Sequence, residues 1–333
     1  MYRRNFELCI DIIYYVITDI LKIETRRLTE RDETMTPPFI NYVTFNRLGL
    51  TERNLRSVLD TTEDFEMHII DSNSKDDTWD FIQSLTDSRI KSKTRFPVNY
   101  GPIFPGNYSL FKRKPDQYFI TLDSDVNIKT KNWISRFMEI FDTFPEVGLL
   151  GVPLAKPYSQ YIPPVIPRSN NGVSYLQLKN GFVDITLDFV PGCCQCLRPE
   201  LIQQIGYWSE ENCYGDAELS IRVNNYTSFK AGFITSIEID MLQEIPCNQC
   251  QAQQWCKLDR VITTCFNIRD KYYKNQSAAK KFHKKYLDSF AELALGKRTA
   301  YCASLYDEES IKKHLYHQQW VSENMAFFLE NSN

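Results

Sequence analysis

YFITLDSD, the stretch from Tyr118 to Asp125, joins an apolar run to two carboxylates. A run of this kind predicts a buried strand, so Asp123 and Asp125 are expected just past its carboxyl end. Open α/β sheets bind their ligands at that edge. Carboxylate oxygens suit Mg²⁺ or Mn²⁺, which usually complete their shells with waters and substrate phosphates. Taken alone, the same pattern is also typical of an exposed turn, so the surrounding sequence has to decide.

Strand and helix patterns alternate on both sides of this stretch. Apolar, β-branched and aromatic runs predict strands at 39–45, 65–70, 89–94, 118–122 and 147–152. Apolar residues at helical spacing predict helices at 75–85, 107–112 and 133–144, and another helix with Thr51 as its N-cap. Strands separated by helices imply an α/β fold with a mostly parallel central sheet, right-handed crossovers and flanking helices.

The pattern changes after residue 152. Residues 156–167 are rich in Pro and Tyr and predict an ordered loop, followed by one or two strands within 175–190. Helices are predicted at 199–205 and 215–224, a strand at 232–239, and a helical, polar region from about residue 247. Because Pro37-Pro38 marks a boundary, we expect three parts. These are an N-terminal helical extension (1–36), an α/β domain (37–245, with halves 37–152 and 153–245) and a cysteine-containing helical region (246–333).

Composition narrows the class of protein. The 333 residues are 43% hydrophobic and 24% charged, an ordinary globular balance that can bury a sizeable core. A net charge of -3 gives no reason to expect a nucleic-acid partner. Leu8 to Leu21 is short and contains Asp11 and Asp19, which favours an amphipathic helix over a membrane span. No secretory leader is evident, so the ten cysteines are expected as reduced thiols in the cytoplasm.

A series of motifs in order resembles the family 2 glycosyltransferases, which are inverting enzymes of GT-A fold. The resemblance covers roughly residues 39 to 240, and although each motif is common alone, five in this order and spacing are not. Besides Asp123-Ser124-Asp125, the motifs are Val43-Thr44-Phe45-Asn46-Arg47; Ile69 to Thr78, with Asp71 and a later Asp-x-Thr; Asn99-Tyr100-Gly101 followed by Asn107; Gly192, Arg198 and Ile205-Gly206-Tyr207-Trp208; and Tyr214 to Arg222.

The resemblance implies a nucleotide-sugar site on the first, second and fourth strands. Asp125 would contact a Mn²⁺ or Mg²⁺ ion directly, with Asp123 facing the ribose or a metal-bound water. Asp71 would accept hydrogen bonds from the uracil or ribose of a UDP-sugar, although an Asp here can also simply cap the next turn. Thr44 would line the base pocket through its backbone. The other residues expected on the donor side are Asn46, Arg47, Asn99, Gly101, Asn107 and Ser124.

The same resemblance makes Asp216 the catalytic base. An Asp that begins a helix is also favoured there without any catalytic role. Attack from the face opposite the diphosphate would invert the anomeric carbon without a covalent intermediate. Tyr207 and Trp208 either stack on the acceptor or pack in the core, and Glu218 is expected on the acceptor side. The acceptor itself could be a saccharide, a lipid or a peptide side chain.

The sequence departs from the family pattern in three places. Gly215 replaces the Glu that usually precedes the base. The family often supplies a His to the metal ion, but no His stands at that place in this sequence. Asp240 is therefore the nearest candidate for a third metal ligand. A cysteine run has no family counterpart, and it could hold structural Zn²⁺, form a disulfide or contain unlinked thiols. Its members are Cys247, Cys250, Cys256 and Cys265. The Lys-rich segment 269–285 could lie on anionic lipid at the inner face of a membrane, bind an acidic acceptor or be a solvated helix face.

Two other functions stay open. A sugar nucleotidyltransferase would need a Gly-rich, Arg-containing loop after the first strand, and residues 46–49 (NRLG) do not supply one. No Gly-x-Gly-x-x-Gly follows that strand and no Walker A pattern occurs in the sequence, which argues against dinucleotide-binding and P-loop proteins. A degenerate transferase fold could serve as a binding module, with Gly215 as a sign of decay, but the four aspartates named above argue against it.

Overall fold

The computed structural model describes residues 36–153, 163–179, 188–212, 215–241 and 277–332. All of these from Pro38 onward belong to one compact unit. The expected N-terminal extension and the cysteine run at 247–265 lie outside the described residues. The boundary expected at 245 stays a prediction for the same reason, although the described C-terminal helices belong to the same compact unit as the sheet.

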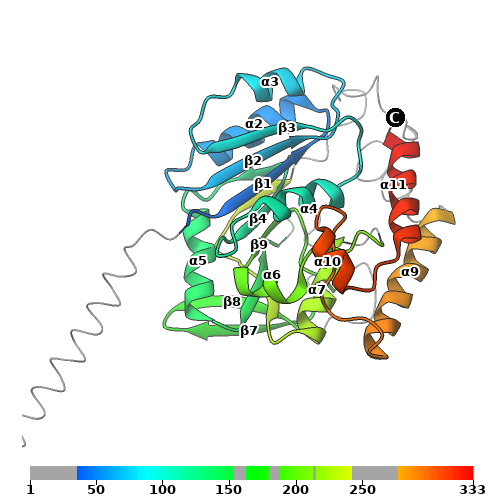
Figure 1. The fold of residues 1–333 in the computed structure, drawn as a ribbon. Helices are drawn as coiled ribbons and strands as arrows, with labels where there is room; N and C mark the ends of the chain where they lie inside the picture. Colours follow the sequence, from blue (N-terminus) through cyan, green and yellow to red (C-terminus); the bar gives the residue numbers. More distant parts are fainter. Residues whose placement is uncertain (1–35, 154–162, 180–187, 213–214, 242–276, 333) are drawn as a thin grey trace, which may run out of the picture. The chain divides into compact units, whose positions relative to one another are not determined.

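In the described residues, nine strands form one sheet in the order β3-β2-β1-β4-β9-β6-β10-β8-β7 (Figure 1). Only β8 and β9 run against the other seven strands, so the sheet is mostly parallel, as the alternating pattern predicts. The strands are β1 (Phe39–Thr44), β2 (Glu66–Asp71), β3 (Ile90–Arg95), β4 (Phe119–Asp123), β6 (Val147–Gly151), β7 (Val165–Asn170), β8 (Val173–Leu178), β9 (Cys194–Leu197) and β10 (Lys230–Phe233). A second, two-stranded sheet pairs β5 (Val126–Ile128) with β11 (Ile239–Met241).

Helices cover both faces of the large sheet. On one face α2, α3 and α5 pack their apolar side chains against Ile40 and Tyr42 of β1. On the other face α4, α6 and α7 pack with Phe39 and Phe119. This alternation along β1 follows from the two-residue period of a strand. The helices are α2 (Leu48–Leu59), α3 (Thr78–Ser84), α4 (Ile103–Lys112), α5 (Trp133–Thr143), α6 (Pro199–Ile205) and α7 (Gly215–Tyr226).

Three C-terminal helices follow, α9 (Ser277–Ala294), α10 (Glu308–Lys313) and α11 (Gln318–Ser332), and they lie on the side of the domain that carries α7 (Figure 1). Tyr286 and Phe290 of α9 form a small apolar cluster with Ala217 and Ile221 of α7. None of the helices in the described part of the chain is long and apolar enough to span a membrane.

Several boundaries differ from the sequence prediction. Thr51 is not an N-cap, because α2 already begins at Leu48, and Thr51 is buried with its hydroxyl 2.9 Å from that of Thr44. The sequence predicts a loop over residues 156–167, but β7 begins at Val165, so that prediction is wrong from Val165 onward. The single strand expected at 232–239 is two strands that pair in different sheets, because residues 234–238 form a turn between them.

The strand β9 decides how the two halves of the domain meet. It lies between β4 and β6 and is antiparallel to both. Cys193, Cys194 and Cys196 at this strand are buried free thiols that pack as small apolar side chains. Because β9 pairs with β4, the residues just before it are held beside the carboxyl end of β4, where the two aspartates follow.

Gly206 provides a test of how the C-terminal region is joined to the domain. It ends α6 with φ 64°, and an added Cβ would lie 2.4 Å from the carbonyl oxygen of Cys302. We expect Gly206→Ala to lower the free energy of unfolding by about 3 kcal/mol, through positive-φ strain and overpacking. Gly296 has nearly the same φ, 67°, but open space around it. Gly296→Ala should therefore cost only about 1 kcal/mol. Equal losses in urea denaturation would contradict the close approach.

Candidate active site

The carboxyl ends of β1, β2 and β4 lie side by side. Thr44 pairs with Asp71 across β1 and β2, and Val43 pairs with Asp123 across β1 and β4. The register therefore brings the predicted donor-side residues of three separate motifs to one edge of the sheet, as the sequence pattern indicates. This is also the edge at which open α/β sheets bind ligands.

The two loops that leave β1 and β2 are hydrogen-bonded to each other. The backbone amide of Asn46 donates to Ser74 Oγ (2.8 Å), and the backbone amide of Lys75 donates to the side-chain oxygen Oδ1 of Asn46 (2.8 Å). Asn46 and Arg47 both have left-handed backbone conformations, with φ of 55° and 64°. Such conformations are uncommon for residues other than glycine, and they persist only where the surroundings enforce them. The cross-links therefore hold the loop from which Arg47 projects in a fixed form.

Asp71 is completely buried and holds its own loop. Its carboxylate accepts hydrogen bonds from the Ser74 amide (3.0 Å) and the Ser74 hydroxyl, and it lies 3.3 Å from Arg95 Nε. Burial raises the pKa of the Asp71 carboxyl, whereas the bonds from Ser74 and the charge of Arg95 lower it. These contacts match the turn-capping alternative for Asp71, and its role in nucleotide binding stays a prediction.

The sequence prediction missed Ser74 and Arg95 as site residues. Arg95 is the last residue of β3 and pairs directly with Asp71 across β2 and β3. A register drawn from the two predicted strand ends would have placed it there, which is the signal that could have found it. Ser74 lies three residues after Asp71, the spacing at which a strand-end Asp commonly caps a turn.

Asp125 is buried without a full set of partners. Its side chain is 7% exposed, and its Oδ2 lies 3.8 Å from Arg47 Nη1. No donor lies within hydrogen-bonding distance of Asp125 Oδ1, which is also buried. Buried carboxylate oxygens are normally satisfied, and an exception calls for an explanation such as a bound ion. This unsatisfied carboxylate oxygen is the kind of ligand that a hard divalent cation prefers, so the chemistry of Asp125 fits such a cation.

The turn between β4 and β5 directs its two aspartates differently. The Asp123 amide donates to the Cys193 carbonyl (2.9 Å), and Asn54 Nδ2 on α2 donates to the Ser124 carbonyl (2.8 Å). These two bonds fix the turn from both sides. Asp123 is exposed, whereas Ser124 and Asp125 are buried. Asp123 thus lies at the surface, and Asp125 faces Arg47.

Asp216 reaches the same edge from α7. The Gly192 amide donates to Asp216 Oδ2 (3.2 Å), and the Ala217 amide donates to Asp216 Oδ1 (2.9 Å). Gly192 precedes Cys193, whose carbonyl accepts the Asp123 amide, so one short loop contacts both aspartates. Burial, followed by the charges of Asp123, Asp125 and Asp216, raises the pKa of the Cys193 thiol. The contacts that connect Asp216 with the β4–β5 turn are therefore those of Gly192 and Cys193.

Asp240, the expected third metal ligand, has another partner. Asp240 is paired with Lys129 Nζ at 2.8 Å on the small β5–β11 sheet. Among the described residues, no group of three or more His, Cys, Asp or Glu side chains is placed to hold a metal ion. The third protein ligand expected at Asp240 is therefore not supported. The four cysteines proposed for zinc lie outside the described residues.

Three residues expected to contact donor or acceptor are internal instead. Asn107 is fully buried and binds both the amide and the carbonyl of Trp208. Trp208 and Tyr207 are buried in the core cluster beneath α4 and α6, which fits the packing alternative. Their hydrogen bonds and burial leave no described surface on which a sugar could stack, so we do not place them in the proposed site.

Glu218 and the Asn99 loop have structural partners. Both carboxylate oxygens of Glu218 accept hydrogen bonds from Arg222 one helical turn later, at 2.8 and 2.9 Å, and both side chains are buried. An acceptor-side role for Glu218 therefore stays a prediction without support from its position. Asn99 Oδ1 accepts the amide of Gly101, whose φ of 81° is the left-handed form that glycine adopts easily.

The comparison with known families follows this geometry. Residues 42–206 match the family described as glycosyl transferase family 2. The chain belongs to this family. The matched segment runs from β1 through α6, so it contains Thr44, Asp71, Asp123 and Asp125 but ends before Asp216. A search of curated protein sequences found no similar protein.

Solved structures of glycosyltransferases resemble parts of the chain. TarS 1–349 from S. aureus is 17% identical with a TM-score of 0.43, and the match covers 60% of this chain and 58% of TarS 1–349. The mannosyltransferase PcManGT from Pyrobaculum calidifontis, solved in complex with GDP-Man and Mn²⁺, is 12% identical with a TM-score of 0.46. That match covers 93% of this chain and 92% of the PcManGT chain. The chain thus spans less than two thirds of the TarS fragment.

Ser74 tests whether the two donor-side loops depend on each other. Ser74→Ala removes a hydroxyl that donates to Asp71 and accepts the Asn46 amide, leaving two buried groups short of a partner. We expect the free energy of unfolding to fall by about 2 kcal/mol. The control is Ser84→Ala, whose exposed hydroxyl only donates to the Phe81 carbonyl. That variant should stay within about 0.5 kcal/mol of the parent. Similar values in denaturant titrations would show that the loops are not coupled.

Proposed function

We propose that the protein moves a sugar from a nucleotide diphosphate sugar to an acceptor, with a divalent cation and with inversion at the anomeric carbon. The observation that carries this proposal is the loop at Gly192 and Cys193, which is hydrogen-bonded to Asp123 on one side and to Asp216 on the other, beside the unsatisfied buried oxygen of Asp125. A leaving diphosphate, its counter-ion and an acceptor hydroxyl all need to meet at one place, and this edge of the sheet is the one at which carboxylates from both halves of the domain meet.

Asp125 and Asp123 are the residues proposed to hold Mn²⁺ or Mg²⁺. A bound divalent cation would neutralise the negative charge that develops on the leaving diphosphate. Asp125 contributes a buried oxygen with no other donor, and Asp123 contributes an exposed carboxylate two residues earlier. Arg47 lies beside Asp125 and can contact a phosphate oxygen from the fixed β1–α2 loop.

Asp216 is proposed as the base that takes the proton of the acceptor hydroxyl or thiol. The amides of Gly192 and Ala217 orient its carboxylate, and its place in the first turn of α7 favours the ionised form. As the proton moves to Asp216, the acceptor oxygen or sulfur bonds to the anomeric carbon while the bond to the diphosphate breaks. Attack from the opposite face accounts for inversion, and no enzyme-bound sugar is formed.

UDP is the nucleotide we propose, and the acceptor class stays open among saccharides, lipids and peptide side chains. The donors for a first panel are UDP-GlcNAc, which appears with TarS in a solved complex, and GDP-mannose, which appears with PcManGT. Contact of the C-terminal region with the inner face of a membrane also stays a proposal. Lys281 and Lys285 of α9 are paired with Glu323, and Lys284 with Asp288, so these charges already have partners.

The metal role is tested by binding. With UDP and Mn²⁺ together, the wild-type protein should melt at a higher temperature than with either alone, because binding to the folded state stabilises it. Asp125→Ala should lose that joint stabilisation. Asp142→Asn, an exposed change on α5, should keep it in full. Thermal shift with and without chelator measures all three proteins. Undiminished stabilisation in Asp125→Ala would refute the assignment.

The base is tested by turnover. Asp216→Asn should bind UDP and Mn²⁺ as the wild type does, since no proton moves in binding. Its rate of UDP release from a donor should fall by about 10²–10⁴-fold, the usual contribution of one positioned base. A coupled assay for UDP, with water or a sugar acceptor present, gives the rate. Pyrophosphate exchange with UTP in the wild type would instead indicate a nucleotidyltransferase. Full activity of Asp216→Asn would refute the base.

A further inference from the structure

The segment from Ile205 to Asn212 joins α6 to α7, the helix that carries Asp216. Asn107 of α4 ties this segment to the donor half of the domain, since its Nδ2 donates to the Trp208 carbonyl (2.8 Å) and its Oδ1 accepts the Trp208 amide (3.0 Å). Two residues later comes Glu210, which is 1% exposed and which the proposed reaction does not use.

The Glu210 carboxylate is held by neutral donors from three parts of the chain. Its Oε1 accepts Asn107 Nδ2 (2.9 Å) and Ser304 Oγ (2.7 Å), and its Oε2 accepts the Leu305 amide (2.8 Å) and the Tyr316 hydroxyl (3.0 Å). Burial raises the pKa of Glu210, and these hydrogen bonds lower it. One side chain therefore connects α4, the segment before α7 and the C-terminal region.

We propose that Glu210 is a positioning residue that sets where Asp216 lies relative to the donor site. The inference rests on the proposed function, because it assigns the segment before α7 a role in placing the base. Asp216 follows Glu210 by six residues, and Glu210 shares the Asn107 side chain with α4 of the donor half. A misplacement of about 1 Å, even from a change remote from the chemistry, can cost on the order of 10²-fold in rate.

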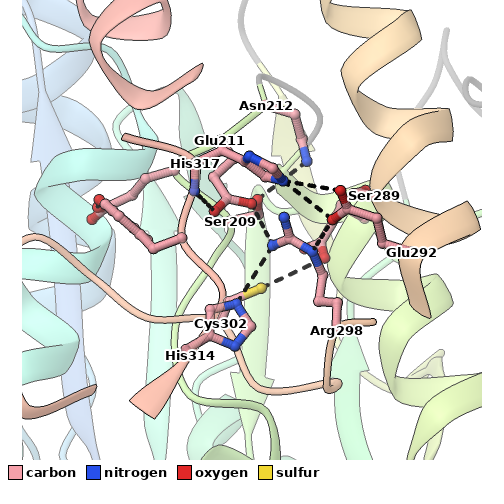
Figure 2. Close-up of polar contacts among 12 residues, drawn as sticks. Ser209, Glu211, Asn212, Ser289, Glu292, Arg298, Cys302, His314 and His317 are labelled. Atoms are coloured by element: carbon pink, nitrogen blue, oxygen red, sulfur yellow. Dashed lines mark hydrogen bonds and ion pairs between the residues drawn. The ribbon is translucent and has the colours of Figure 1, made fainter. Parts of the chain in front are cut away.

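A second set of contacts fixes the same segment at the next residue (Figure 2). Glu211 accepts hydrogen bonds from the Arg298 guanidinium and from the His317 amide (2.7 Å). Arg298 Nε in turn donates to Glu292 (2.9 Å), which also lies 3.0 Å from His317 Nε2. The four residues form a closed ring, in which His317 takes part through both its backbone amide and its side chain, and the ring joins Glu211 to α9 and the C-terminal region.

The helix α7 is clamped to the same frame. Arg222, fully buried, donates to the carbonyls of Ile205 (2.6 Å), Tyr207 (2.9 Å) and Ala300 (3.2 Å) while it pairs with Glu218. The amide of Tyr207 donates to the Cys302 carbonyl (3.0 Å). The start of the segment, the helix behind it and the chain around residues 300–302 therefore form one hydrogen-bonded body, to which Glu210 connects the donor half.

Glu210→Gln is the informative change because its neighbours cannot adapt to it. Whichever way the Gln amide turns, its NH₂ group faces either the Leu305 amide or Asn107 Nδ2, which are both donors. The Leu305 amide is fixed in the backbone. Asn107 cannot flip, because both its polar atoms are already committed to Trp208. The variant keeps the size of the side chain and breaks one hydrogen bond of the junction.

The experiment compares turnover with binding. For Glu210→Gln we expect kcat for UDP release to fall by about 10- to 100-fold, with the dissociation constant for UDP and Mn²⁺ within about twofold of wild type. Tyr316→Phe removes one of the four donors and is the milder second variant, for which about a threefold loss of kcat is expected. Glu200→Gln, an exposed carboxylate on α6, is the matched control and should match wild type. Each rate is corrected for the folded fraction at the assay temperature.

Equal losses in kcat and nucleotide affinity would overturn the inference, because they would indicate general loosening. Wild-type kcat in Glu210→Gln would overturn it as well. Amide hydrogen exchange gives a readout that needs no turnover, and exchange in the first turn of α7 should be faster in Glu210→Gln than in Glu200→Gln. If the wild-type protein transfers no sugar, the proposed function fails, and unchanged exchange in α7 then separately refutes the positioning role.

Discussion

Negative charge held together at one edge of the sheet is the constraint on which the rest of the structure depends. Asp123 and Asp125 follow β4, whereas Asp216 lies about ninety residues later in the first turn of α7. The strand β9 overcomes the separation in sequence, because its pairing with β4 places Gly192 and Cys193 between the aspartates. A bound divalent cation at Asp125 would neutralise charge at this edge.

Three carboxylates of the site and its junction, Asp71, Asp216 and Glu210, are held mainly by donors that carry no charge. Asp71 is bonded to Ser74, Asp216 to two backbone amides, and Glu210 to an amide side chain, two hydroxyls and one backbone amide. A carboxylate that is held in this way keeps its direction, whereas removal of one donor leaves a buried group unsatisfied. The same physical device therefore fixes the donor loop, the base and the junction with the C-terminal region.

Sequence reasoning predicted what depends on local pattern. The first strands, α5, α6 and α7, and the placement of Asp71 and Asp123 at one edge of the sheet follow from periodicity and parallel register. Sequence reasoning was wrong where the position of a side chain depends on a partner that is distant in the sequence. Asn107 looked like a donor-site residue, but its partner is Trp208, 101 positions away in sequence. Thr51 looked like an N-cap, but its hydroxyl lies against Thr44 inside the domain. The contacts of Glu210 with residues 304–316 had no sequence signal at all.

The central claim is that these carboxylates gather a cation and a nucleotide diphosphate at one edge of the sheet. A crystal grown with Mn²⁺ and UDP, with data collected for anomalous scattering from manganese, tests it most directly. The account predicts one strong peak within about 2.5 Å of an Asp125 or Asp123 oxygen, bridged to the diphosphate, with Asp216 facing the same space. A peak elsewhere, or nucleotide bound with no metal beside these aspartates, would contradict it.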